Sequence, residues 1–261
     1  QLTNLLDGPR DLFASRVAYS ITDFTMNKGI IRRAQNPANG STMAVLDFNV
    51  EGFTPIVRNV TINNLGTDNS TIQMQYVTAT GTRAFYFTNP TVAASANRQY
   101  PGVPTANQAT GDLHVLAVGA IAQPQTTSSL NRFAIKMFRD AVDQTVDMGP
   151  PLAAVAVSTV ATSPYEQLRA EYNKYFSAAL SQTETGVFRA VRLSATAGYI
   201  SVSTTVDISI PNFSAVAGWD NLWGLVAGTV VNTLFLANGW TQAGGVVESP
   251  FAEGAIWRYG V

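Results

Sequence analysis

The chain has 261 residues, a formal net charge of −1 and no cysteine, which excludes disulfides, thiolate nucleophiles and cysteine-ligated metals. Charged residues make up 13% of it, about half the roughly 25% of an ordinary soluble domain, and no basic stripe that would bind nucleic acid is present. The length suffices for two domains with separate hydrophobic cores.

Segments in the first half alternate apolar and polar residues with a period of two, which is typical of β-strands. Turn residues separate them at intervals of about 10–15 residues, a rhythm that predicts a sandwich or barrel rather than βαβ units. The segment 89–112 contains three prolines and is predicted to be a long contact loop. The predicted strands are residues 16–24, 42–50, 57–65, 71–78, 83–87 and 113–122, with a strand pair in 132–148.

A break between two domains is predicted at Gly149, Pro150 and Pro151, because two prolines after a glycine cannot lie inside a β-ladder. We expect a first β-sandwich domain at 13–149 and a second at 150–247. The ends, 1–12 and 248–261, contain large apolar residues and are predicted to be tails that dock on a partner.

The pattern restarts after the prolines. Strands are predicted at 152–162, 188–200 and 205–210, and two strands joined by a turn at 222–240. The uncharged segment 222–240 is nearly long enough to span a membrane, but its glycines and asparagines favour strands. Residues 165–181 fit either one helix or two strands; the strand rhythm around them slightly favours strands.

Three segments of the second half resemble repeat units of exported immunoglobulin-like or fibronectin-like envelope proteins of bacteria. They are VDMGPPLAAVAVSTVATSPYEQLRAEY, RAVRLSATAGYI and VDISIPNFSAVAGWDNLWGL, and the likeness covers about residues 145–240. It implies a β-sandwich of the cell envelope that acts as a spacer, coat or accessory subunit, with no catalytic residues to carry over. The fold class predicted for the chain is all-β, with two immunoglobulin-like β-sandwich domains in tandem.

Few residues could carry chemistry. The single histidine, His114, lies two residues after Asp112 on a predicted strand, but a catalytic pair also needs a positioned nucleophile, and no G-x-S-x-G elbow is present. Local hydrogen bonding explains this histidine better. Asp140, Asp143 and Asp147 could offer oxygen ligands to calcium but lack the spacing of a calcium loop. We therefore predict no catalytic, cofactor or metal site and no enzyme.

The aromatic residues are the other candidates. Trp219 and Trp223 bracket Asp220 and Asn221. Such tryptophans fill a core, anchor a protein interface or stack on sugars, and filling a core is the commonest of these roles. The interface candidates are Trp219, Trp223, Tyr100, Phe251, Trp257 and Tyr259.

These observations predict a contact function. Gln1 in place of a methionine indicates a mature N-terminus left by removal of a signal peptide, and hence a periplasmic or extracellular protein. We expect a non-catalytic structural or accessory subunit that binds the protein subunits of a larger complex. That complex could be a membrane complex on which the chain lies peripherally, a photosynthetic reaction-centre or light-harvesting complex included. The alternatives are a self-assembling coat or filament protein, a carbohydrate-binding module that uses tryptophans, and an unrecognised hydrolase.

Overall fold

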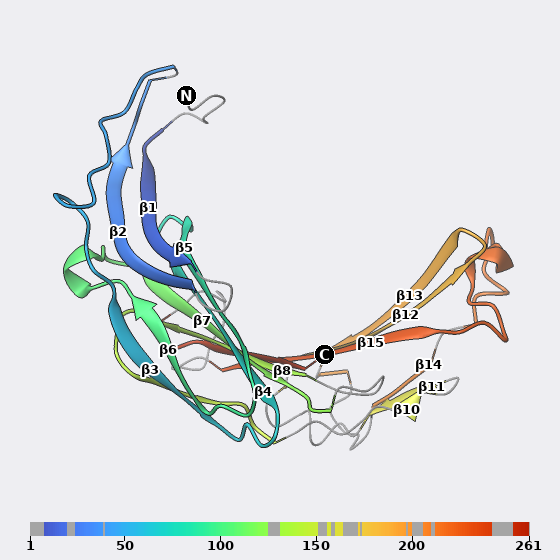
Figure 1. The fold of residues 1–261 in the computed structure, drawn as a ribbon. Helices are drawn as coiled ribbons and strands as arrows, with labels where there is room; N and C mark the ends of the chain where they lie inside the picture. Colours follow the sequence, from blue (N-terminus) through green and yellow to red (C-terminus); the bar gives the residue numbers. More distant parts are fainter. Residues whose placement is uncertain are drawn as a thin grey trace.

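The fold is almost entirely β (Figure 1). The computed structural model describes residues 8–19, 24–38, 40–124, 131–150, 156–157, 160–163, 172, 174–196, 198–199, 206–209, 212–241 and 253–260. The helical pieces in these ranges are two 3-10 turns, Thr105–Asn107 and Asn221–Trp223, and none of the described helical segments could cross a membrane. The prediction of an all-β chain is confirmed.

One long antiparallel sheet runs through the described part of the molecule. Its strands are β4 (Asn69–Val77), β5 (Arg83–Val92), β7 (Leu113–Ile121), β8 (Arg132–Phe138), β12 (Tyr175–Glu184), β13 (Val187–Thr196), β15 (Asn232–Thr241) and β16 (Ile256–Gly260). Their spatial order is β13-β12-β15-β16-β8-β7-β4-β5. The C-terminal strand β16 thus lies between β15 and β8, so a single sheet contains strands from both sides of residue 149.

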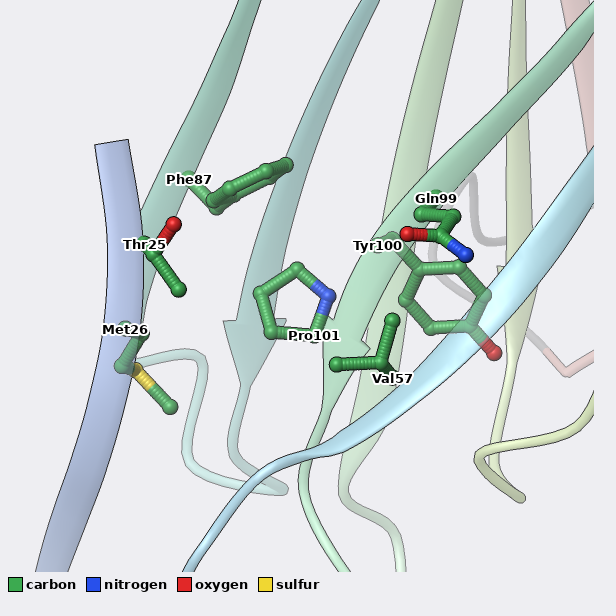
Figure 2. A pocket seen from close by; sticks show the side chains of 7 residues that line it. All are labelled: Thr25, Met26, Val57, Phe87, Gln99, Tyr100 and Pro101. Atoms are coloured by element: carbon green, nitrogen blue, oxygen red, sulfur yellow. The ribbon is translucent and has the colours of Figure 1, made fainter. Parts of the chain in front are cut away.

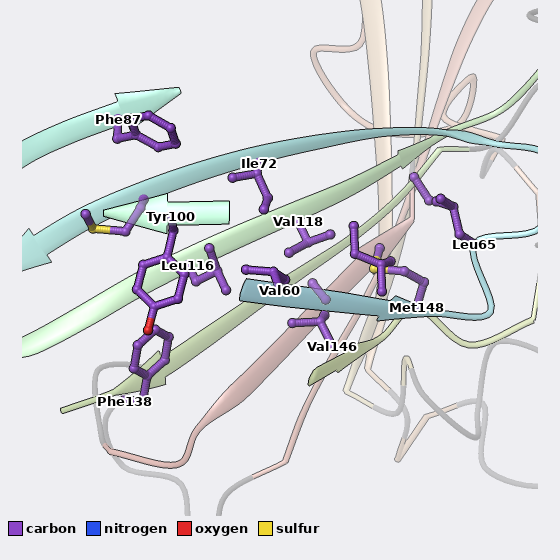
Figure 3. Packing of buried hydrophobic residues seen from close by; sticks show 14 residues of the cluster. Val60, Leu65, Ile72, Phe87, Tyr100, Leu116, Val118, Phe138, Val146 and Met148 are labelled. Carbon is purple, nitrogen blue, oxygen red and sulfur yellow. The ribbon is translucent and has the colours of Figure 1, made fainter. Parts of the chain in front are cut away.

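A smaller sheet packs on one half of the long sheet and encloses the main core (Figure 3). It consists of β6 (Asn97–Gly102), β3 (Ile56–Asn63) and β9 (Gln144–Asp147), in that order, and β3 pairs with β9 in parallel. In β4 the side chains of Ile72, Met74 and Tyr76 are fully buried and Gln73 between them is exposed, so the strand turns one face to the core. The core cluster comprises Val60, Ile62, Leu65, Ile72, Met74, Phe87, Tyr100, Leu116, Val118, Ala120, Ala134, Phe138, Val146 and Met148.

A curved hairpin of β1 (Arg10–Tyr19) and β2 (Phe24–Gln35) lies beside this sandwich (Figure 1). Aromatic rings join the two parts: Phe85 of β5 meets Phe13 and Phe53 edge to face, with ring centroids 5.5 and 5.7 Å apart. Such pairs stabilise by about 0.5–1.5 kcal/mol beyond the area they bury. The hairpin is therefore docked on the sandwich by an apolar contact.

The remaining strands form an arm. In Figure 1, β12, β13 and β15 run away from the sandwich, and the loop 212–231 lies at their far end. The short strands β10 (Ala156–Val157), β11 (Val160–Ser163) and β14 (Val206–Ser209) form a separate small sheet. We call β12, β13, β15 and the loop 212–231 the arm.

A buried arginine ties the sandwich together. Arg132 of β8 is fully buried and forms an ion pair of 2.7 Å with Asp68. Its guanidinium also donates to the carbonyl oxygens of Asn64 (3.0 Å), Leu65 (3.2 Å) and Gly149. One side chain therefore holds the β3–β4 turn and the segment after β9 against β8.

The strand predicted at 42–50 is wrong, because these residues form an irregular loop. Val45 and Val50 are more than 80% exposed. The Arg32 guanidinium binds the carbonyl oxygens of Ala44 and Val45 at 2.7 and 2.6 Å, which occupies acceptors that a β-ladder would use. The same group forms a two-pronged pair with Glu51, and its hydrogen bond lowers the pKa of that carboxyl to about 2.

Two other segments differ from their predictions, and a third agrees with its prediction in part. The contact loop expected at 89–112 contains β6, in which Pro101 is tolerated because this is an edge strand. Residues 222–240 form one strand, β15, preceded by a 3-10 turn and a loop. For the ambiguous residues 165–181, the preference for strand is confirmed from Tyr175 onward by β12, whereas 165–171 lie outside the described residues.

Candidate interaction site

An aromatic cluster occupies the end of the arm. The rings of Phe213 and Trp219 lie with centroids 4.8 Å apart, and Trp219 meets Trp223 edge to face at 5.6 Å and 85°. Trp219 and Trp223 were predicted as interface candidates, and the structure brings them together. We call this cluster, with its neighbours Val216 and Leu222, the aromatic tip.

Local sequence shapes the loop that carries the tip. The side chains of Asn212 and Asp220 accept hydrogen bonds from the backbone two residues later, at Ser214 (3.0 Å) and Leu222 (2.8 Å). These are Asx turns. Gly218 has a φ of 82°, a conformation that glycine adopts without strain. The loop therefore turns sharply at the positions that set the two tryptophans side by side.

Two side chains of the β12–β13 hairpin hold the loop in place. Gln182, 1% exposed, donates to the carbonyl oxygens of Val226 (2.9 Å) and Thr229 (3.2 Å) and accepts from the Val226 amide (2.7 Å). Arg189 donates to the carbonyl oxygen of Leu222 at 2.8 Å. These hydrogen bonds fix the loop before it binds, which reduces the conformational entropy lost when the tip binds a partner.

Replacing Gln182 with alanine should loosen the tip. It would leave the buried Val226 amide and two carbonyls without their partner, which costs about 1–3 kcal/mol. Hydrogen exchange of amides in 212–231 should accelerate roughly 5–150-fold, since 1.4 kcal/mol is a factor of ten. Gln73→Ala, at an exposed position of β4, should leave this exchange unchanged. Equal exchange in both variants would contradict the anchoring role.

Large apolar side chains are exposed at this end of the arm. Trp223 is 59% exposed, Leu222 69% and Phe188 of β13 68%. Asp220 is the one charged residue of the loop 212–231. Single exposed apolar residues are ordinary, but patches of about 300–600 Å² often mark interaction sites. Trp223 therefore does not fill a core in the described structure, which was the commonest role expected of it.

The two residues that could suggest catalysis are used internally. His114 is fully buried; its Nε2 accepts from the Val103 amide (2.9 Å) and its Nδ1 donates to the Arg139 carbonyl oxygen (2.7 Å). Burial lowers the pKa of His114 to about 4, so the ring is neutral at pH 7. Local hydrogen bonding of His114 is confirmed, and both ring nitrogens are occupied.

Asp112 anchors the hairpin to the sandwich. Its Oδ2 accepts from Tyr76 (2.6 Å), Arg33 of β2 (2.5 Å) and the Ala109 amide (2.7 Å), and its Oδ1 from the Ala79 amide (3.1 Å). Burial opposes its charge, but these donors together hold the pKa of Asp112 below its ordinary value. The Asp112 carboxylate is therefore ionised, and both of its oxygens accept hydrogen bonds within the fold, as is typical of a structural role.

The acidic residues considered as calcium ligands accept hydrogen bonds from other groups of the chain. Asp143 accepts from the Asn59 amide at 2.9 Å, and Asp147 accepts from the Asn64 side chain (2.7 Å) and the Gly149 amide (2.8 Å). The side-chain bond from Asn64 is the main cause that lowers the pKa of Asp147. Among the described residues, no group of three or more metal-ligating side chains gathers.

The other interface candidates lie elsewhere. Tyr100 belongs to the core: it is fully buried, and its hydroxyl donates to the Val142 carbonyl oxygen at 2.6 Å. Burial raises the pKa of Tyr100 to about 12. Trp257 and Tyr259 lie on β16, which is hydrogen-bonded on both sides to strands of the same chain. Phe251 lies outside the described residues.

Sequence reasoning missed a groove between the hairpin and the sandwich (Figure 2). It has a volume of about 300 Å³ and opens to solvent. No periodic pattern could have located it, because its walls come from four strands that only the tertiary fold brings together. Its lining comes from β2, β3, β5 and β6: Thr25, Met26, Val57, Phe87, Gln99, Tyr100 and Pro101.

Comparisons with models of known protein families, with curated proteins and with solved structures find no match for this chain. The likeness to bacterial envelope proteins therefore stays an expectation from sequence motifs, and any function has to be argued from the geometry of the tip.

Proposed function

We propose that the chain is a non-catalytic structural or accessory subunit that binds protein through the aromatic tip of its arm. The observation that carries this proposal is the exposed Trp223, packed against the half-buried Trp219, on a loop with one charged residue that the buried Gln182 holds. Tryptophan is among the commonest hot-spot residues of protein interfaces. A loop that is already ordered loses little freedom on binding, so more of the contact energy appears as affinity.

Tip geometry favours a protein over a sugar. The planes of Trp219 and Trp223 are nearly perpendicular, so their faces do not form one flat platform for a sugar ring. The Asp220 carboxylate, the charged group beside them, already accepts from the Leu222 amide. A concave apolar surface of another protein matches such a protruding tip better.

From the sequence motifs, we also propose that the chain lies in the bacterial periplasm or cell envelope, where it braces a larger complex. An arrangement of two immunoglobulin-like sandwich domains in tandem belongs to the proposal as well. Support for the sandwich comes from the two sheets that pack around the main core.

A capture experiment tests the proposal. Immobilised full-length chain and its Trp223→Asp variant are incubated with membrane and soluble extracts of the source cells. A hot-spot tryptophan contributes about 2 kcal/mol or more, so the variant should retain a specific partner roughly 30-fold less. Val45→Asp, at an 86% exposed valine of the loop 41–52, is the matched control and should retain the partner fully.

Two results would contradict the proposal. One is equal retention of the partner by the Trp223→Asp and Val45→Asp variants, because the tip would then be irrelevant to binding. The other is glycan binding that disappears with Trp223→Asp while no protein is retained, which would indicate a carbohydrate-binding module.

A further inference from the structure

Two surface features, each with an exposed apolar side chain, lie at opposite ends of the molecule. The aromatic tip ends the arm, whereas the groove lies between the hairpin and the sandwich, beside β2, β3, β5 and β6 (Figure 1). One feature protrudes and the other is hollow. Two protruding tips would touch over little area, but a tip and a groove can interdigitate.

The groove has the size and lining for one large side chain. Its volume of about 300 Å³ is at the lower end of the range of small-molecule sites, about 300–1,000 Å³. Val57, which is 58% exposed, and Phe87, which is 7% exposed, are among its walls, whereas Tyr100 is fully buried (Figure 2). An inserted indole could meet the Phe87 ring edge to face or offset, the arrangements that aromatic pairs prefer.

Charge favours a contact between the tip and the groove over a contact between two tips. Of the five basic residues in 10–35, Arg32 already pairs with Glu51, and Arg33 with Asp11 and Asp112. In the hairpin, Arg16 of β1 lies opposite Lys28 of β2, next to Val17, which lies opposite Met26. Met26 lines the groove. The tip loop contributes only the Asp220 carboxylate. A tip in the groove brings opposite charges together, whereas tip against tip brings two Asp220 residues together.

We propose that the tip of one copy docks in the groove of the next, with Trp223 inserted between Val57 and Phe87 of its neighbour. This inference rests on the proposed function and names its partner as a second copy of the chain. The contact is heterologous, because each copy uses a different surface at each end. Repetition of such a contact produces rings if the rotation closes and filaments if it does not.

Sedimentation velocity of the full chain over a wide concentration range tests this inference. Wild type should form species that lengthen with concentration. Trp223→Ala removes the inserted side chain and keeps the groove; Val57→Glu puts a charge in the groove and keeps the tip. Each variant alone should stay monomeric. Their equimolar mixture should form a dimer and stop there, because it contains one intact tip and one intact groove for each pair.

The mixture also shows that both variants are folded, since a misfolded partner could not complement the other. Val45→Glu should assemble as wild type does. The inference is overturned if wild type is monomeric throughout, if Val57→Glu alone assembles as wild type does, or if the mixture forms no dimer. A monomeric wild type that captures another protein in a Trp223-dependent manner overturns this inference alone. Assembly that is indifferent to Trp223→Ala contradicts the proposed function as well.

Discussion

Replacement of Arg132 by methionine is expected to destabilise the chain by about 3–5 kcal/mol, the usual loss when one partner of a buried ion pair is removed. The guanidinium is fully buried and serves Asp68 and the carbonyls of Asn64, Leu65 and Gly149. Methionine fills much of the space but donates no hydrogen bond. The Asp68 carboxylate, which is 13% exposed, would then lose the guanidinium that pairs with it.

Urea unfolding followed by tryptophan fluorescence and far-UV circular dichroism measures this effect. Arg192→Met is the control, because Arg192 is exposed on β13 and its hydrogen bond to the Tyr175 hydroxyl is 3.3 Å long. That variant should stay within about 0.5 kcal/mol of wild type. A loss below about 1 kcal/mol for Arg132→Met would show that the arginine does not hold the sandwich together.

Acidification from pH 7 to pH 4 should remove about 3 kcal/mol of stability through His114 alone. Burial lowers the pKa of His114 to about 4, against about 6.5 in the unfolded chain. Between these values the unfolded chain binds a proton that the folded chain does not, so stability falls as the pH falls through this window. A difference of about 2.5 pKa units at about 1.4 kcal/mol each is about 3.5 kcal/mol in full, of which about 3 kcal/mol is lost by pH 4, where half of the folded chains also carry the proton.

The attribution is direct because His114 is the single histidine. Unfolding free energies at half-unit steps of pH should fall steadily below pH 6.5 in wild type. His114→Gln keeps a donor for Arg139 and an acceptor for Val103 but does not titrate, so its stability should be flat down to about pH 5, below which the carboxyl groups with lowered pKa values, such as Glu51, begin to lose stability. Equal slopes in both proteins would place the pH dependence elsewhere.

The sequence predicted strands best where one face is buried. Ile72, Met74 and Tyr76 alternate with polar residues, and the burial of β4 follows that alternation as far as Tyr76. Residues 42–50 show a similar alternation and form a loop, because Arg32 binds two of their carbonyls. The alternation shows which residues are apolar. It cannot show that a distant side chain forms hydrogen bonds with the carbonyl oxygens that a β-ladder would use.

The pairing of strands that are distant in the sequence could not be predicted. In β16, Ile256 pairs with Lys136 of β8 and Gly260 with Ala237 of β15, and no local pattern indicates either partner. Trp219 and Trp223 could be named as candidates from residue type and spacing. Their contact with Phe213, and the anchor at Gln182, depend on a loop that folds back onto β12.

Oxidative footprinting of the chain, free and within its assembly, tests the central claim most directly. Hydroxyl radicals modify exposed Trp, Phe and Leu side chains, and mass spectrometry locates the change. The account predicts that protection on assembly is greatest at Leu222 and Trp223, which are 69% and 59% exposed in the single chain. Unchanged oxidation of these two residues in an intact assembly would contradict it.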